Sequence, residues 1–266
     1  MAYFEHDGVR SYYETRGQGK PLFFLHGLGG STIQTANTLG DLEGYQCIFL
    51  DQRGHGNSSL GDPASLTYEE LAKDVVLLAK HLGVEFPFAI GGISMGAAVS
   101  VKVALMYPKA VEKLLLVRLA ICQGYSPEPI PRWYGAFAQY LCAKNAGGFF
   151  TSKVFAEVQS KAPLLADTFK RLFTQKDALR YPQKYGIIPG LRLFSDMNDL
   201  ERIEAPTLIL ANRLDAVHAF EYGEEFHRYI PNSQLFEVTS KAVDPIAHCT
   251  EVTRRIQQFL TAKFHI

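Results

Sequence analysis

Short apolar runs alternate with amphipathic stretches along most of this chain, and this alternation constrains the fold more than any other feature. The runs at 21–25, 47–50 and 114–117 are almost wholly apolar. Strands have this composition when helices cover both faces of their sheet. Between the runs, stretches such as 67–82 carry apolar residues at helical spacing. The alternation therefore predicts an α/β fold with a mainly parallel sheet.

The helix expected after Thr67 is the best marked. Glu70 follows Thr67 by three residues, which is the spacing of a capping box. One face of the helix then carries the apolar residues Leu71, Val75, Leu78 and Leu82. We expect further helices over 97–106, 219–229 and 250–262, and further strands over 88–90, 207–211 and 234–238.

The rhythm changes between residues 120 and 198. Prolines cluster at 127, 129 and 131, and no apolar run in this segment resembles a buried strand. The alternation resumes at 206. We therefore predict an α/β core formed by 1–119 and 199–266, with a helical cap at 120–198 inserted between two strands of one sheet. The cap segment has ten Lys and Arg against five Asp and Glu. That excess suits either an anionic substrate or a solvated basic helix face.

Composition and charge exclude several classes of protein. Lys and Arg number 27, and so do Asp and Glu, so the chain lacks the basic excess that nucleic-acid binding needs. No apolar run approaches the ~18 residues of a membrane span. The first residues lack a signal peptide's basic and apolar regions, and the four cysteines form no CxxC pair. We expect a cytoplasmic protein with reduced thiols, no nucleic-acid partner and no membrane insertion.

Gly92-Ile93-Ser94-Met95-Gly96 lies between an apolar strand and a helix of small residues. A serine on a strained strand-to-helix turn exposes its hydroxyl, and the flanking glycines let neighbouring backbone approach closely. The alternative is a plain structural turn. We predict that Ser94 is a nucleophile.

A serine nucleophile needs a base, which is usually a histidine. The chain has eight: His6, His26, His55, His81, His218, His227, His248 and His265. In α/β hydrolases the base follows the acid and comes last in chain order. We predict His248, which follows the last expected strand. His218 is the main rival, but it would have to follow its acid by three residues within one loop.

The acid that orients this base is predicted to be Asp215, which follows the strand at 207–211. Asp244 is the rival, but a residue four positions before His248 is badly placed to reach the far ring nitrogen. For the oxyanion we predict the backbone N–H groups of Met95, next to the nucleophile, and Leu28, in the loop after the first central strand. We expect the side chain of His26 to shape that loop.

Taken together in order, these motifs resemble the α/β-hydrolase superfamily over almost the whole chain. The matching pieces are the loop His26-Gly27, the segment 51–58 (DQRGHGNS), the 92–96 turn, Asp215 and His248. The resemblance is nearest to compact esterases, lactonases and C–C hydrolases. It implies a sheet of about eight strands and a helical cap. A serine at 94 argues against the dehalogenase and epoxide hydrolase branches, which have aspartate there.

The resemblance implies a serine hydrolase of small or medium carboxylic esters or lactones, working through an acyl-enzyme without metal or organic cofactor. A C–C hydrolase acting on a diketone-type acid, or a non-catalytic ligand receptor, are the alternatives. We expect a small-molecule substrate, and a homodimer is left open. Arg118, Trp133 and Phe137 are candidates for substrate contacts, since pockets are mostly apolar with a few polar groups.

Overall fold

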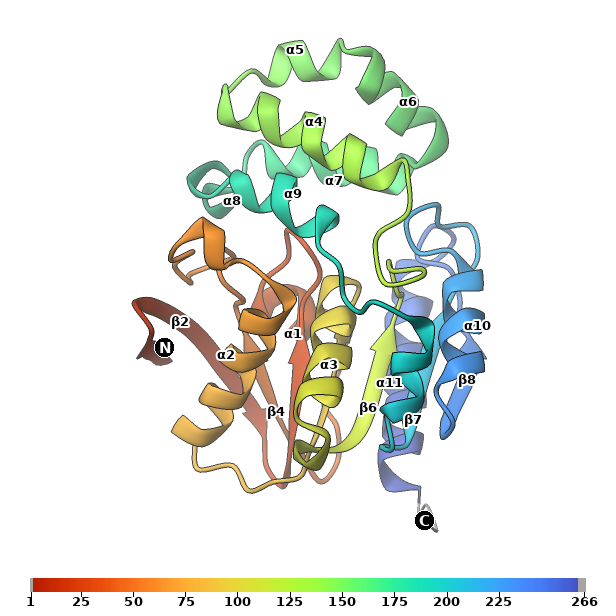
Figure 1. Cartoon of the computed structure of the whole chain (residues 1–266). Helices are drawn as coiled ribbons and strands as arrows, with labels where there is room; N and C mark the ends of the chain where they lie inside the picture. The colour runs from red at the N-terminus through yellow and green to blue at the C-terminus, as the bar shows by residue number, and fades with distance from the viewer. Residues whose placement is uncertain (1, 263–266) are drawn as a thin grey trace.

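The computed structural model describes residues 2–262, and its centre is one sheet of eight strands (Figure 1). Met1 and residues 263–266, among them His265, lie outside the described residues. The strand order is β1-β2-β4-β3-β5-β6-β7-β8. The first two strands pair antiparallel and the other six are parallel to one another. The strands are β1 (Ala2–His6), β2 (Val9–Gly17), β3 (Lys20–Leu25), β4 (Tyr45–Leu50), β5 (Phe88–Ile93), β6 (Val111–Val117), β7 (Thr207–Ala211) and β8 (Ser233–Glu237).

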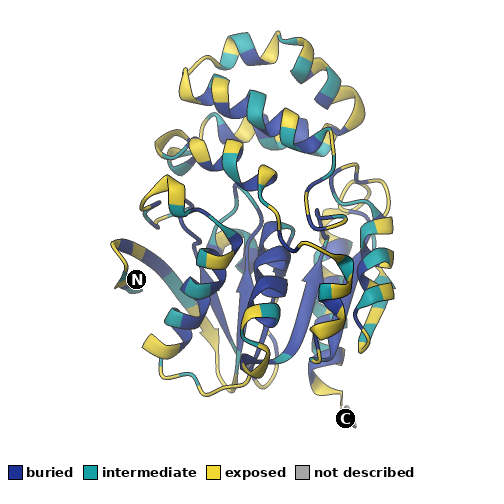
Figure 2. Cartoon of the chain, in the orientation of Figure 1, coloured by how far each residue is buried: buried dark blue, intermediate teal, exposed yellow. Residues whose placement is uncertain are grey.

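Helices cover both faces of this sheet, as the apolar strands predicted. Alternate residues of β3 face opposite sides. Leu22 and Phe24 share a core with α1 and α11, whereas Phe23 and Leu25 share one with α2, α3 and α10. Figure 2 shows the resulting buried layer along the strands and the inner helix faces. The expected α/β fold is thus confirmed. The five helices are α1 (Thr32–Thr38), α2 (Tyr68–His81), α3 (Met95–Met106), α10 (Phe220–Tyr229) and α11 (Pro245–Thr261).

Six further helices lie between β6 and β7 in the chain, and they stand above the carboxyl ends of the strands (Figure 1). We call residues 130–187 the cap. Its interior is aromatic, with the ring of Phe137 stacked on that of Phe169 at 4.3 Å between centroids. The division of the chain at 120 and 198 stays a prediction. The helices of the cap are α4 (Ile130–Cys142), α5 (Ala146–Phe150), α6 (Lys153–Lys161), α7 (Pro163–Leu172), α8 (Lys176–Arg180) and α9 (Gln183–Ile187).

Capping side chains set the first residues of two helices, α2 and α11. The Oγ1 of Thr67 accepts the N–H of Glu70 at 3.2 Å, so α2 begins where the capping signal predicted. The last helix differs from its prediction. It begins at Pro245 instead of residue 250, because the carboxylate of Asp244 accepts the N–H groups of Ile246 and Ala247. His248 therefore lies in the first turn of α11 and not in the loop before it.

Among residues 2–262, no helix combines the length and the apolar character that crossing a bilayer demands.

Candidate active site

Ser94 stands at the sharp turn from β5 into α3, in a backbone conformation that side chains rarely adopt. Its φ is 55° and its ψ is −112°. Such strain costs about 1–3 kcal/mol and persists only where the surroundings hold it. Gly92 and Gly96 allow the neighbouring backbone to pack closely enough to hold Ser94 in this conformation. A Cβ at Gly92 would lie 2.6 Å from the carbonyl oxygen of Leu25, and one at Gly96 would overlap that same oxygen.

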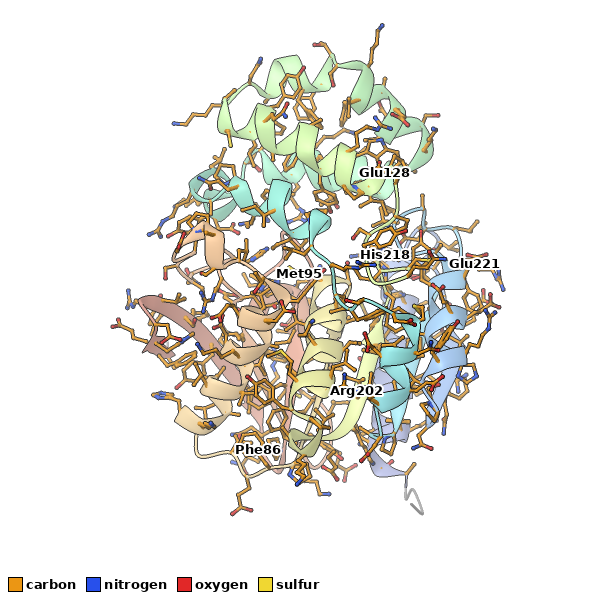
Figure 3. All side chains as sticks on the ribbon, in the orientation of Figure 1. Phe86, Met95, Glu128, Arg202, His218 and Glu221 are labelled. Carbon is orange, nitrogen blue, oxygen red and sulfur yellow. The ribbon has the colours of Figure 1, made fainter. Side chains whose placement is uncertain are left out.

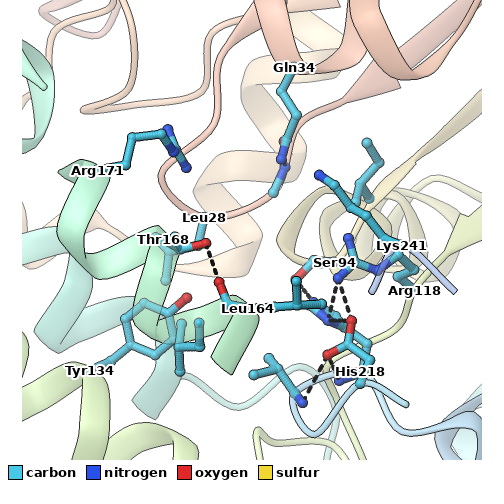
Figure 4. Close-up of a pocket in the computed structure, with 15 residues that line it drawn as sticks. Leu28, Gln34, Ser94, Arg118, Tyr134, Leu164, Thr168, Arg171, His218 and Lys241 are labelled. Atoms are coloured by element: carbon cyan, nitrogen blue, oxygen red, sulfur yellow. Dashed lines mark hydrogen bonds and ion pairs between the residues drawn. The ribbon is translucent and has the colours of Figure 1, made fainter. Parts of the chain in front are cut away.

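The imidazole of His218 lies directly between this serine and a carboxylate. His218 Nε2 is 3.0 Å from Ser94 Oγ, and His218 Nδ1 is 3.0 Å from Asp215 Oδ2. The three side chains form a continuous hydrogen-bonded chain, drawn in Figure 4. Figure 3 shows His218 below the cap and level with Met95 at the top of the sheet. This is the arrangement of a serine, a base and an orienting acid.

The loop after β7 folds back on itself, and this brings His218 to an acid only three residues away. Asp215 Oδ1 accepts the N–H groups of Val217 at 3.1 Å and of His218 at 3.2 Å. These bonds form a tight turn that leaves Oδ2 free to accept the ring N–H of His218. A short separation in sequence is therefore no obstacle to the contact.

The structure corrects the prediction of His248 as the partner of Ser94. His248 is buried, and its Nδ1 lies 2.8 Å from the carbonyl oxygen of Thr239. Because His248 lies in the first turn of α11, its ring points to the loop before that helix, which contains Thr239. His218 makes the contact with Ser94 instead. Asp244, the rival acid, caps α11 instead.

Arg118, a candidate for substrate contact, is already paired with protein groups. Its guanidinium donates to Asp215 Oδ2, and its Nη2 lies 3.1 Å from His218 Nδ1. Its charge is therefore balanced inside the protein by Asp215. Arg118 still forms part of the wall beside Ser94.

These residues meet because they follow three neighbouring parallel strands. The N–H of Ser94, after β5, donates to Val117 O at the end of β6 at 2.9 Å. The N–H of Arg118, after β6, donates to Leu210 O on β7 at the same distance. Asp215 follows β7. Carboxyl ends of parallel strands share one edge, which is where such sheets place ligands.

The surroundings of the Ser94–His218–Asp215 hydrogen bonds keep Asp215 ionised and His218 neutral. Burial alone would raise the pKa of Asp215, but the hydrogen bonds from His218 and Arg118 and the charge of the guanidinium outweigh it and hold that pKa well below its ordinary value. Burial lowers the pKa of His218, and the charge of Arg118 lowers it further against the opposing effect of Asp215. A neutral imidazole beside a carboxylate is the state that a general base requires.

The two residues whose backbone N–H groups are expected to hold an oxyanion line one hollow together with Ser94. Met95 is the first residue of α3, where an N–H has no acceptor within the helix. Leu28 comes from the loop after β3, and both residues border a hollow that Ser94 also lines. His26 shapes that loop. The Nε2 of its ring accepts the N–H of Gln52 at 3.0 Å, and its Nδ1 lies 2.8 Å from Gly27 O.

Two hollows adjoin Ser94, and they differ in character. A cavity of about 190 Å³ holds the polar groups Arg118, Asp215 and His218. A smaller one of about 30 Å³ is lined almost entirely by apolar side chains, including Met95 and Ile121. The site therefore has one polar side and one small apolar side.

The aromatic residues proposed for substrate contact do not line either hollow. Trp133 and Phe137 are almost completely buried in the core of the cap. Tyr134, which lies between them in α4, borders both hollows instead. The correction follows from helix geometry, because successive residues of a helix point in directions about 100° apart.

Comparison with known proteins agrees with this architecture. Residues 20–244 match the family model described as the alpha/beta hydrolase fold. The chain belongs to the α/β-hydrolase fold family. The resemblance inferred from the motifs is thereby confirmed.

This α/β hydrolase has named relatives that match along most of its length. Lipase 1 of Psychrobacter immobilis is 34% identical over 257 residues, which are 92% of this chain and 78% of the relative. Lipase 3 of Moraxella sp. (strain TA144) is 27% identical over 260 residues, which are 95% and 78% of the two chains.

Solved structures of similar fold are more distant in sequence. The enol-lactonase from Burkholderia xenovorans LB400 has a TM-score of 0.79 and 20% identity, over 98% of this chain and 100% of the other. A thermophilic esterase from Thermogutta terrifontis has a TM-score of 0.73 and 22% identity, over 97% and 96%. At these identities the likeness concerns the fold.

Four residues of the α/β hydrolase's polar cavity were not foreseen from the sequence. They are Gln34, Thr168, Arg171 and Lys241. Thr168 and Arg171 share one face of α7 with Leu164, at spacings of 4 and 3, so helical periodicity could have grouped them once α7 was recognised. Gln34 and Lys241 carry no such signal.

The described part of the chain, residues 2–262, brings together no group of three or more His, Cys, Asp or Glu side chains suited to a metal ion.

Proposed function

We propose that this α/β hydrolase is a serine hydrolase that cleaves small or medium carboxylic esters or lactones, with Ser94, His218 and Asp215 as its triad. The observation that carries the proposal is the hydrogen-bonded chain from Ser94 Oγ through the His218 ring to Asp215 Oδ2. The strained turn at Ser94 and the lipases among its relatives support the same reaction.

The proton positions follow from the charge of Asp215. An ionised carboxylate only accepts hydrogen bonds, so the proton of the His218 ring is on Nδ1, directed at Asp215. Nε2 then carries the lone pair that accepts the Ser94 hydroxyl. Arg118 donates to the same carboxylate oxygen. Its 3.1 Å approach to Nδ1 is a contact between two donors that share one acceptor.

Acylation uses this arrangement directly. Ser94 Oγ attacks the carbonyl carbon of the ester while its proton moves to His218 Nε2. The N–H groups of Leu28 and Met95 hold the oxyanion that forms. His218 then gives its proton to the leaving alkoxide, which departs as an alcohol and leaves the acyl group on Ser94.

Deacylation repeats the steps with water. His218 Nε2 takes a proton from a water molecule, whose oxygen attacks the acyl carbon. The tetrahedral intermediate collapses, Ser94 regains its proton from His218, and the carboxylic acid leaves. Asp215 stabilises the imidazolium in both halves of the cycle.

The test is labelling with a fluorophosphonate, followed by peptide mapping, together with turnover of p-nitrophenyl acetate. Wild type should carry the adduct on Ser94, and Ser94→Ala should carry none. His218→Ala should lower kcat by about 10³-fold, because it removes the general base.

The matched control is His248→Asn, which alters the buried histidine that the sequence favoured as the base. It should retain labelling and most of the turnover, with folding checked by circular dichroism. Equal losses in His218→Ala and His248→Asn would contradict the assignment of the base. A folded wild type without adduct or turnover would instead favour a ligand receptor.

A further inference from the structure

The polar cavity beside Ser94 adjoins a second, larger cavity of about 560 Å³, which we call the outer cavity. Both are bordered by the same four side chains, which therefore stand at the boundary between them: Gln34, Thr168, Arg171 and Lys241. Figure 4 draws Arg171, Gln34 and Lys241 on one side of the pocket, with Ser94 and His218 on the other. A molecule that reaches Ser94 from the outer cavity passes these residues.

Two of the boundary residues are cations whose side chains have no hydrogen-bond or ion-pair partner among residues 2–262. They are Arg171, at the end of α7, and Lys241, in the loop after β8. Desolvation lowers the pKa of Lys241, and the charges of Arg118 and Arg171 lower it further, against the opposing effects of Cys249 and Asp215. Both side chains are exposed to solvent, so a ligand can reach them.

The acids of the outer cavity are already engaged elsewhere. Asp51 accepts the N–H groups of Thr32 at 2.6 Å and Asn57 at 2.8 Å. Asp177 accepts the buried ammonium of Lys184 at 3.2 Å, and Glu14 accepts the hydroxyl of Tyr12. In the inner cavity, Asp215 pairs with Arg118. None of these acids forms an ion pair with Arg171 or Lys241 among residues 2–262.

Gln34 adds a neutral donor to the same place. Its Oε1 accepts the N–H of Gly27 at 2.8 Å, which leaves the Nε2 donor of the amide turned the other way. Within the described residues no acceptor is recorded for this Nε2. A guanidinium, an ammonium and an amide thus offer donors to one region, and such a set suits carboxylate or phosphate oxygens.

We propose that the substrate carries an anionic oxygen group, a carboxylate or a phosphate, held by Arg171, Lys241 and the Gln34 amide while the scissile ester lies at Ser94. The small apolar hollow beside Met95 would take a short apolar part on the other side of that bond. This inference rests on the proposed function for its ester bond, but the anion site can be tested without catalysis.

The first experiment compares hydrolysis of three acetyl esters of similar size: neutral 2-acetoxyethanol, anionic acetoxyacetate and 2-acetoxyethyl phosphate. Dimethyl succinate and methyl hydrogen succinate form a second pair, with the anion on the acyl part. At low ionic strength we expect kcat/KM for an anionic member to exceed that for its neutral partner by about tenfold. The preference should shrink as salt is added. The two acetyl arms distinguish a carboxylate from a phosphate.

Three variants locate the effect. Arg171→Gln and Lys241→Gln should each reduce the anionic-to-neutral ratio of kcat/KM by about fivefold. The matched control is Lys170→Gln, which removes a positive charge from the same helix. Lys170 pairs with Asp167 and does not border the cavities. It should leave the ratio as in wild type.

A second experiment separates this inference from the proposed function. In Ser94→Ala, which cannot form an acyl-enzyme, the anionic esters should raise Tm more than their neutral partners do, and Arg171→Gln should remove the difference. No preference in rate and no difference in Tm would overturn the anion site. Failure of every ester to react, with the Tm difference retained, would overturn the proposed function and leave the anion site standing.

Discussion

Asp215 is shared by two donors, and this sharing defines the chemistry of the site at the scale of single residues. Its Oδ2 accepts both Arg118 and the ring N–H of His218, while its Oδ1 accepts two backbone N–H groups. The carboxylate therefore stays ionised. Arg118 also disfavours the imidazolium form of His218, because its positive charge lowers the pKa of that ring.

Removing that cation should shift the pH dependence of activity. Arg118 lowers the pKa of His218, so Arg118→Gln should raise it. Only the neutral imidazole acts as a base, and hence the acidic limb of kcat/KM for p-nitrophenyl acetate should move to higher pH, by up to about one unit. A pH–rate profile measures this shift.

Two variants make the result specific. Arg118→Lys keeps the charge and should shift the limb less than Arg118→Gln. Arg213→Gln removes a cation that pairs with exposed Glu237 in the same region and should leave the limb in place. A limb that moves to lower pH in Arg118→Gln would contradict the assignment.

At the scale of elements, the turn from β5 to α3 is held by close packing against β3. Gly96 stands where any side chain would overlap the carbonyl oxygens of Leu25 and His26. The strained conformation of Ser94 and the close approach at Gly96 therefore depend on each other. The strand supplies a rigid end, and the helix begins so close to β3 that no Cβ fits between them.

Gly96→Ala should therefore destabilise the fold by about 3 kcal/mol and lower activity, because the turn must move to admit the methyl group. Urea unfolding followed by fluorescence gives the free energy of unfolding.

Gly135→Ala is the matched control for this substitution. Gly135 lies inside α4 with no atom within 4 Å of an added Cβ, so alanine there should stabilise the protein by about 0.5–1 kcal/mol. Similar losses in both variants would show that close approach at the turn is not the cause.

At the scale of the whole molecule, a buried lysine joins the cap to the core. Lys184 of α9 is 0% exposed, and its ammonium donates to the carbonyl oxygen of Gly54 in the core and to Asp177 of α8 in the cap. Burial lowers its pKa to about 8, against the partial opposition of Asp177. The contact thus couples the position of the cap to an ionisable group.

The lowered pKa of Lys184 makes the free energy of unfolding depend on pH. Between pH 8 and the ordinary lysine pKa of 10.5, the unfolded chain binds this proton and the folded chain releases it. Stability therefore rises with pH in that window. Relative to Lys184→Met, the free energy of unfolding of wild type should increase by about 2 kcal/mol from pH 8 to pH 9.5.

Urea titrations at the two pH values measure this difference. Lys176→Met, at an exposed lysine of neighbouring α8, serves as the control and should follow wild type. A wild-type stability that falls relative to Lys184→Met over this range would refute the role of Lys184.

Most of the fold could be predicted from the sequence because its signals are local. Apolar runs and capping residues such as Thr67 act within a few residues of the chain, and the six parallel strands and α2 formed where they indicated. The turn at Ser94 was equally readable, since the strand, the glycines and the helix are contiguous. The boundary of α11 was not, because Pro245 and the capping Asp244 extend the helix back beyond its apolar face.

The partner of Ser94 was decided by tertiary structure. The sequence by itself determined a nucleophile turn, an acid after β7 and two histidines that could serve it. Chain order favoured His248, but the first turn of α11 directs that ring to Thr239 O. The fold of the 215–218 loop, in which Asp215 accepts the N–H groups of Val217 and His218, carries the His218 ring to Ser94. Such a choice depends on where two loops end in space, and no local pattern of residues encodes that distance.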